Sequence, residues 1–259
     1  MNSLVTVTPS SIVRRNNDAV VSFQGGKYQD SLALFQEALG NVRAKLAVAD
    51  HQAAADTRRP KDTVLLIQGV PLDESIRSSA RIQVDNSSGM TFFDRCFLIA
   101  NPLTTADNDT TSASASASSE AHINSLLDDN ECKVCSVLLY NIGATHHLAG
   151  LATGSQQELD KAFKVYQMAL EFLQIEYENQ QQEQMDNVLL ILSMAIMNNI
   201  AHIQSTWFQY PQARHCTQWL REAAEHMDTA LLRDPDFMFF FLRYYVLPFN
   251  DVSSCSAAA

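Results

Sequence analysis

A short recurring pattern constrains the fold of this chain more than any other feature. In each copy an asparagine precedes a small residue by two positions, near the start of an apolar stretch with helical periodicity. A second set of small or apolar residues follows in each copy. This set begins at Ser31 in the first copy, at Ala162 in the second and at Ala213 in the third. Self-similarity of this kind marks arrays of one supersecondary unit, which stacks on its neighbours to bury an apolar face. The sequence therefore predicts three stacked helical hairpins. The three copies are Asn17-Asp18-Ala19, Asn141-Ile142-Gly143 and Asn199-Ile200-Ala201.

Changes in periodicity and composition divide the chain into six segments. The first hairpin breaks at Gly25-Gly26, and its second helix carries apolar residues at three- and four-residue spacing. In the third hairpin we expect helices over 187–206 and 211–232. We expect a first helical hairpin over 1–56, an inserted β-hairpin region over 57–102, a disordered loop over 103–120, a second hairpin over 121–180, a third hairpin over 181–232, and an aromatic C-terminal strand and tail over 233–259.

The β assignments rest on composition. Residues 63–67 and 90–99 are rich in branched or aromatic side chains, residues 79–84 alternate apolar with polar, and 85–89 favour a tight turn. Residues 104–119 are almost entirely Ser, Thr, Ala and Asp, which cannot bury enough surface to offset their ordering entropy. In the tail, Asp234-Pro235-Asp236 is compatible with a short capping helix. The density of Phe and Tyr over 237–247 favours a strand packed beside the insertion.

Charge and composition exclude several classes of function. The chain has 259 residues, 46% of them apolar, and a formal charge of -11 from 18 basic and 29 acidic residues. Such an acidic surface repels phosphate backbones, so we expect no nucleic-acid partner. We expect no membrane span and no secretory signal, because no apolar run reaches the required length. With five cysteines, an odd number, free buried thiols are favoured over disulfides. These features predict a cytoplasmic location, with the nucleus as an alternative.

The second hairpin resembles the tetratricopeptide repeat (TPR) family. Its first helix has the family spacing at Leu139, Ile142, Gly143 and His146, and its second helix has it at Ala162, Tyr166 and Ala169. The resemblance implies a mainly α, TPR-like array of about three hairpins, into which a small antiparallel β element is inserted. A plain helical bundle is the alternative. The chain departs from the family by lacking the proline that ends the second helix and by a long connection inside the second hairpin.

The resemblance also implies a concave groove lined by the first helix of each hairpin. An asparagine side chain has both a donor and acceptors, so a row of asparagines can bind the backbone of an extended peptide without demanding a sequence. The alternative is that these asparagines satisfy neighbouring helix backbone. Phe23 and Tyr140 are the expected aromatic anchors. Carried over by position, the expected partner-binding residues are Asn16, Asn17, Phe23, Tyr140, Asn141, His147, Asn198, Asn199 and His202.

Function is expected to be noncatalytic, with no catalytic residue, metal or cofactor. Cys132 and Cys135 lie close to His146 and His147, and they define the alternative of a metal- or thiol-dependent protein or enzyme. Zinc requires four ligands around one tetrahedron, and adjacent histidines on a helix diverge by about 100 degrees. The acidic and histidine side chains over 222–228 are explained by a solvated helix face. The sequence therefore predicts a protein–protein interaction scaffold that binds a peptide or a partner helix, of unknown identity, in its groove.

Overall fold

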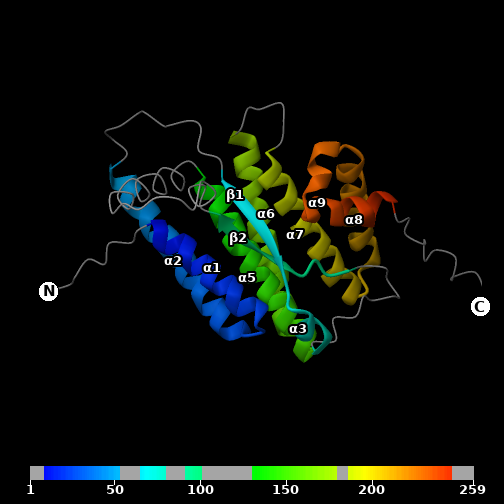
Figure 1. The fold of residues 1–259 in the computed structure, drawn as a ribbon, viewed down its shortest axis with the longest axis horizontal. Coiled ribbons are helices and arrows are strands. Elements are labelled where there is room, and N and C mark those ends of the chain that lie inside the picture. The colour runs from blue at the N-terminus through cyan, green and yellow to red at the C-terminus, as the bar shows by residue number, and fades with distance from the viewer. Residues whose placement is uncertain (1–8, 53–64, 80–90, 101–129, 180–185, 247–259) are drawn as a thin grey trace, which may run out of the picture.

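The structure is a computed structural model, which describes residues 9–52, 65–79, 91–100, 130–179 and 186–246. Three helical hairpins follow one another across the molecule, from the blue pair to the yellow and orange pair in Figure 1. The predicted fold class, a mainly α hairpin array with a small inserted antiparallel β element, is confirmed. The hairpins are α1 (Pro9–Gln24) with α2 (Tyr28–Gln52), α5 (Glu131–Thr153) with α6 (Gln156–Asn179), and α7 (Asn187–Thr206) with α8 (Tyr210–Glu225).

Local sequence signals set the ends of these helices. The α1–α2 turn places Gly26 at a φ of 70°, and the α5–α6 turn places Gly154 at 67°, which are left-handed values that favour glycine. Asp186 caps α7, since its carboxylate accepts a hydrogen bond from the Val188 N–H at 2.7 Å. Pro211 lies in the first turn of α8, where its missing N–H is harmless.

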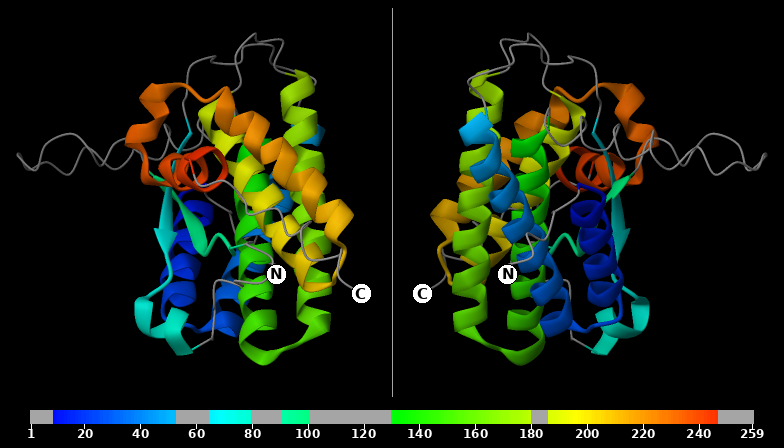
Figure 2. Two further views of the ribbon diagram at one scale, coloured as in Figure 1. Left: turned by 90° about the vertical axis from the view of Figure 1, so that its right-hand side faces the viewer. Right: turned by 90° about the vertical axis from the view of Figure 1, so that its left-hand side faces the viewer.

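The hairpins stack in a regular way. The first helix of each later hairpin contacts both helices of the hairpin before it, so α5 packs on α1 and α2, and α7 packs on α5 and α6. As a result α1, α5 and α7 share an inner layer, and α2, α6 and α8 lie outside it. The two turned views in Figure 2 show the helices running side by side along the molecule.

Small residues allow close approach inside the hairpins. A Cβ placed on Gly143 would lie 2.6 Å from a ring carbon of Tyr166, so the ring occupies the space that a side chain there would need. In the first hairpin the Ser31 hydroxyl donates to the Ala19 carbonyl at 2.9 Å. The recurring small residue therefore lies at the crossing of the paired helices.

The inserted element crosses the inner layer. Strand β1 (Leu66–Pro71) pairs antiparallel with β2 (Arg95–Ala100), with Gly69 opposite Phe97, and α3 (Glu74–Ser79) lies between them in sequence. Strand β2 contacts α1 and α5. The predicted first strand is shifted, because β1 continues through Gly69, Val70 and Pro71. Residues 80–90, with the predicted turn, and the predicted loop over 103–120 lie outside the described residues.

The predicted C-terminal strand is wrong. Residues Pro235–Phe241 form helix α9, and a π-helical turn continues through Leu242–Val246. Asp234 caps α9 and Pro235 occupies its first turn. The buried aromatic residues Phe237, Phe240 and Tyr244 recur at three- and four-residue spacing, which is the helical period and not that of a strand. The predicted contact with the insertion is present, since the Phe240 and Phe93 ring centroids lie 4.9 Å apart.

One further helix boundary differs from the expectation. Helix α8 ends at Glu225, and residues Thr229–Arg233 form a separate 3-10 turn, so the predicted helix over 211–232 is too long. Asp228 accepts a hydrogen bond from the Ala230 N–H and caps this turn, which explains the break. Helix α5 begins at Glu131, and residues 121–129 lie outside the described part of the chain.

Helix α7 is the most apolar helix of the three hairpins. Its 20 residues, with a mean hydropathy of 1.4 over the best window, satisfy the length and composition of a membrane span. That window is 83% buried against the neighbouring helices and the strand region. A buried core helix passes the same test, and the packing of α7 on α5, α6 and α8 accounts for its composition.

Candidate functional site

The repeated asparagines bind the backbone of the chain itself. One asparagine from the first helix of each hairpin reaches an extended segment, residues 91–99, which we call the strap. Each receives a hydrogen bond from a strap N–H and donates one to the carbonyl of the same residue. The pairs are Asn199 with Phe93 (2.9 and 3.2 Å), Asn141 with Phe97 (2.8 and 2.9 Å) and Asn17 with Ile99 (3.1 and 3.1 Å).

This arrangement replaces a neighbouring strand. A side-chain amide presents one N–H group and one carbonyl in the same plane, as a peptide group does. Phe97 and Ile99 lie two positions apart on β2, so their backbone groups point to the same edge, and the residues between and beside them point to the opposite edge. One edge of β2 is thus paired with β1, and the other is satisfied by helix side chains. A buried strand edge without such partners would leave polar groups unpaired at high cost.

Further polar side chains complete the row. Asn16 donates to the Phe97 carbonyl at 3.0 Å and accepts from Asn141 at 3.0 Å. Asn198 donates to the Thr91 carbonyl at 2.9 Å. The Tyr140 hydroxyl donates to the Arg95 carbonyl at 2.9 Å. The inner face therefore contacts backbone from Thr91 to Ile99.

The strap side chains form part of the core. Phe92, Phe93, Phe97 and Ile99 are all buried, with exposed fractions of 3% or less. Complete burial of one such side chain contributes about 1.5 to 3 kcal/mol, so these four contribute roughly 6 to 12 kcal/mol. The whole stability of a domain is about 5 to 15 kcal/mol. Displacement of the strap by an outside peptide would thus remove most of the stability of the fold.

The structure brings the predicted groove residues together on one face. Eight of the nine are buried and Asn17 is half-buried. The five asparagines and Tyr140 contact the strap backbone. His147 packs on the strap residue Phe92, with ring centroids 4.4 Å apart, and its Nε2 lies 3.0 Å from Nδ1 of His202. Phe23 is a core residue of α1 with no exposed surface.

Sequence reasoning missed the strap as the segment held by the asparagines. It also missed a polar cluster that joins the strap to the C-terminal helix. Asp236 of α9 is buried, pairs with Arg95 at 2.5 Å and accepts a hydrogen bond from the Gly69 N–H at 3.1 Å. Burial raises the pKa of Asp236, and Arg95 opposes that rise. The sequence signal for this cluster is the position of Asp236 in the first turn of α9, which Asp234 caps. This signal depends on a helical assignment of the tail.

Burial raises the pKa of all four thiols in the described residues. Burial raises the pKa of Cys135 to about 12, and burial together with Glu176 raises the pKa of Cys132. A thiolate is the nucleophile and metal ligand, so raised pKa values oppose both roles. In the described part of the chain, four cysteines carry free thiols, and no three His, Cys, Asp or Glu side chains gather as a metal site.

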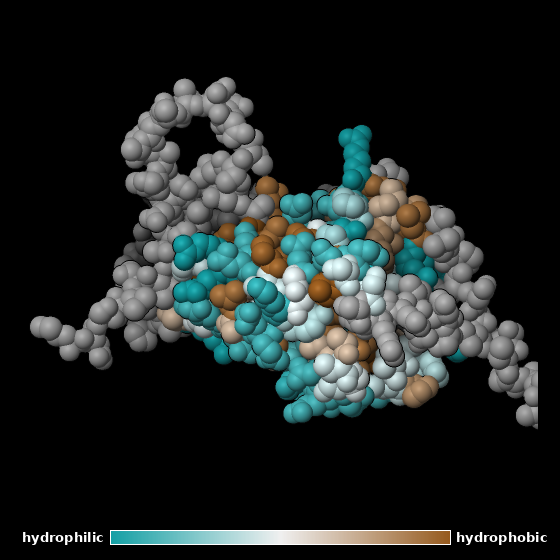
Figure 3. Space-filling view, turned by 60° about the horizontal axis from the view of Figure 1, so that its bottom comes forward, coloured by the Kyte–Doolittle hydropathy of each residue, from teal (hydrophilic) through white to brown (hydrophobic). Residues whose placement is uncertain are grey.

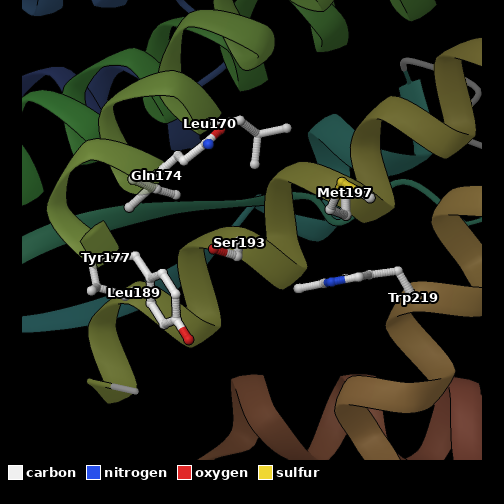
Figure 4. A pocket seen from close by; sticks show the side chains of 8 residues that line it. Leu170, Gln174, Tyr177, Leu189, Ser193, Met197 and Trp219 are labelled. Atoms are coloured by element: carbon white, nitrogen blue, oxygen red, sulfur yellow. The ribbon is translucent and has the colours of Figure 1, made fainter. Parts of the chain in front are cut away.

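The outer side of the array carries an apolar groove. Leu170, Leu173, Gln174 and Tyr177 of α6 form one wall, Trp219 of α8 forms the other, and Leu189, Ser193 and Met197 of α7 form the floor. The groove has a volume of about 370 Å³, and Figure 4 shows these side chains around it. Tyr177 is 55% exposed at its edge. On the face shown in Figure 3, hydrophobic side chains lie in small separate patches among hydrophilic ones.

A second hollow at the helix turns carries charged side chains at its rim. It lies between the α1–α2 and α5–α6 turns and is lined in part by Lys27, Asp30 and Glu158. Glu158 already pairs with Lys161 at 2.7 Å and with His146 at 2.6 Å. The charges there are mixed, and this hollow favours no particular ligand.

No protein-family model, no curated protein and no solved structure matches this chain. The described residues give the array two distinct faces, an inner face bound by the strap and an outer face with an apolar groove.

Proposed function

We propose that this protein is a noncatalytic interaction scaffold, a TPR-like hairpin array that is closed on its own strap and binds a partner helix in the outer groove. The observation that carries the proposal is the division between its two faces. The inner face is filled by the strap, and the groove of α6, α7 and α8 is apolar, with Tyr177 exposed at its edge among the described residues. An array of this kind needs no reactive group, since it acts by presenting a shaped surface.

The outer groove has the geometry of a site for one helix. Its floor residues Leu189, Ser193 and Met197 lie four residues apart along α7, and Leu170, Leu173 and Tyr177 form a parallel row on α6. A groove between two helical rows accepts the apolar face of an amphipathic helix, which offers anchors at matching spacing. The aromatic edges Tyr177 and Trp219 are the expected energetic centres, because such residues often carry interface energy.

The proposed place of binding therefore differs from the groove expected from the sequence. The asparagines were expected to bind an extended peptide partner, and residues 91–99 of the same chain occupy their side-chain amides. The roughly 6 to 12 kcal/mol estimated for strap burial argues against exchange with an outside peptide. The outer groove requires no such displacement.

The test is quantitative affinity capture of a partner by three purified forms of the protein: the wild type, a groove variant and a control variant. The groove variant carries Tyr177→Ser and Trp219→Ala, and the control variant carries Val21→Ser and Met168→Ser, which remove exposed apolar surface elsewhere. Thermal melts confirm that each variant is folded. We expect the wild type and the control to capture the same partner and the groove variant to lose it at least tenfold, by roughly the 1.4 kcal/mol that a tenfold change represents. Equal capture by the groove variant would refute the outer site.

A further inference from the structure

A buried histidine pair lies where the strap enters the inner face. His147 of α5 is fully buried and His202 of α7 is 6% exposed, and their ring nitrogens lie 3.0 Å apart. Phe92 of the strap packs on both rings, with centroids 4.4 Å from His147 and 6.2 Å from His202. The pair is thus in direct contact with one end of the strap.

Among the described residues, no carboxylate pairs with His147. The titratable groups that face it are His202 from α7 and Tyr166 from α6, whose ring lies 6.1 Å away, and the strap presents only Phe92. Its neighbour in sequence, His146, binds Glu158 instead. Burial, and then His202, lower the pKa of His147 well below its usual range. The Nδ1 atom of His147 has no hydrogen-bond partner in the part of the chain that the structure describes.

The same part of α7 holds this end of the strap. Asn198 binds Thr91 and Asn199 binds Phe93, and Asn198 lies one helical turn before His202. The other end of the strap is bound by Asn17 of α1. A change at the histidine pair therefore acts first on the Thr91–Phe93 end.

We propose that the histidine pair is an acid-sensitive seat for the strap: protonation places positive charge in this buried contact and releases the Thr91–Phe93 end from α7, while the Ile99 end stays bound to α1. The sign follows from linkage. A histidine whose pKa is lowered in the folded state stabilises that state fully above the unfolded pKa of about 6.5, and this contribution is lost as pH falls below that value. Titration of His147 in this way favours the released state by about tenfold at pH 5.5.

Amide hydrogen exchange on the intact protein tests the proposal. Protection factors of the Phe93 and Ile99 N–H groups are compared at pH 7.5 and pH 5.5, which removes the intrinsic pH dependence of exchange. We expect the protection of Phe93 to fall about tenfold or more at pH 5.5 and that of Ile99 to change little. His147→Gln should abolish the fall, and His215→Gln, at an exposed histidine of α8, should retain it.

Three results would overturn the proposal. The first is unchanged protection of Phe93 at pH 5.5. The second is an equal loss at Ile99, which indicates general unfolding. The third is a fall at Phe93 that persists in the His147→Gln variant. If this variant does not fold, the comparison of Phe93 with Ile99 in the wild type decides the question alone.

Discussion

At the scale of single residues, the side-chain amides of asparagines hold the strap against the inner helices. Asn17, Asn141 and Asn199 occupy one equivalent position in three hairpins, and each pairs with the N–H and carbonyl of one strap residue. The energetic consequence is asymmetric, because a buried backbone group without a partner costs more than its hydrogen bond contributes.

Asn141→Leu tests this hydrogen bonding, because the leucine side chain has the same number and branching of heavy atoms as asparagine but neither donor nor acceptor. The variant leaves the buried Phe97 N–H without an acceptor and removes a donor to Asn16. We expect a loss of about 2 to 4 kcal/mol in the free energy of unfolding, measured by urea denaturation. Gln167→Leu, at an exposed position on α6, makes a similar chemical change and should stay within about 0.5 kcal/mol. Equal stability of the two variants would contradict the role of Asn141.

Two glycines should respond in opposite directions to the same substitution. In Gly143→Ala the new methyl group would lie 2.6 Å from the fully buried Tyr166 ring, so we expect a loss of about 1 to 3 kcal/mol in unfolding free energy. Gly40 lies exposed within α2 with open space around it, and Gly40→Ala should stabilise the protein by about 0.5 to 1 kcal/mol. Urea midpoints that move in the same direction would refute the helix crossing.

At the scale of elements, helix α9 is attached to the strap region by a small polar cluster and by aromatic packing. Asp236 approaches β1 so closely that a Cβ on Gly69 would overlap its carboxylate. The Phe93 ring packs on Phe239 and Phe240 at 5.1 and 4.9 Å. The C-terminal helix therefore depends on the strand for its position.

Gly69→Ala should detach this helix while the hairpins remain folded. We expect cleavage by a nonspecific protease between α8 and α9 to become at least tenfold faster, since the Asp236 contact with β1 and Arg95 is displaced. Far-ultraviolet circular dichroism should change little. A cleavage pattern identical to that of the wild type would show that the contact does not hold α9.

The elements also differ in how far the sequence predicts them. The spacing of Asn17, Asn141 and Asn199 indicated three hairpins, and the TPR resemblance together with the chemistry of the amide implied a face able to bind extended backbone. It did not indicate the occupant, because an amide recognises a peptide group whatever side chain the peptide carries. The C-terminal segment was misassigned since its aromatic content suggests a strand, whereas burial of Phe237, Phe240 and Tyr244 follows the helical period. In this segment the aromatic content favoured a strand and the spacing of the aromatic residues favoured a helix. The segment is helical because that spacing buries Phe237, Phe240 and Tyr244 on one side.

At the scale of the whole molecule, the strap joins all three hairpins. Its hydrogen bonds reach α1, α5 and α7, and its aromatic residues contact α9. If protease sites are introduced within 80–90 and 101–129 and then cut, we expect the strap fragment to coelute with the helices on size exclusion and to separate only in denaturant. Release of the fragment in native buffer would show that the strap is not part of the core.

The most direct measurement is the exchange rate of three amides at neutral pH. The N–H groups of Phe93, Phe97 and Ile99 donate to asparagine side chains of the inner helices. If the repeated asparagines hold the strap, these three amides exchange as slowly as those in the middle of α5 and α7. Exchange at the rate of an exposed segment, with the helices still protected, would contradict the closed inner face.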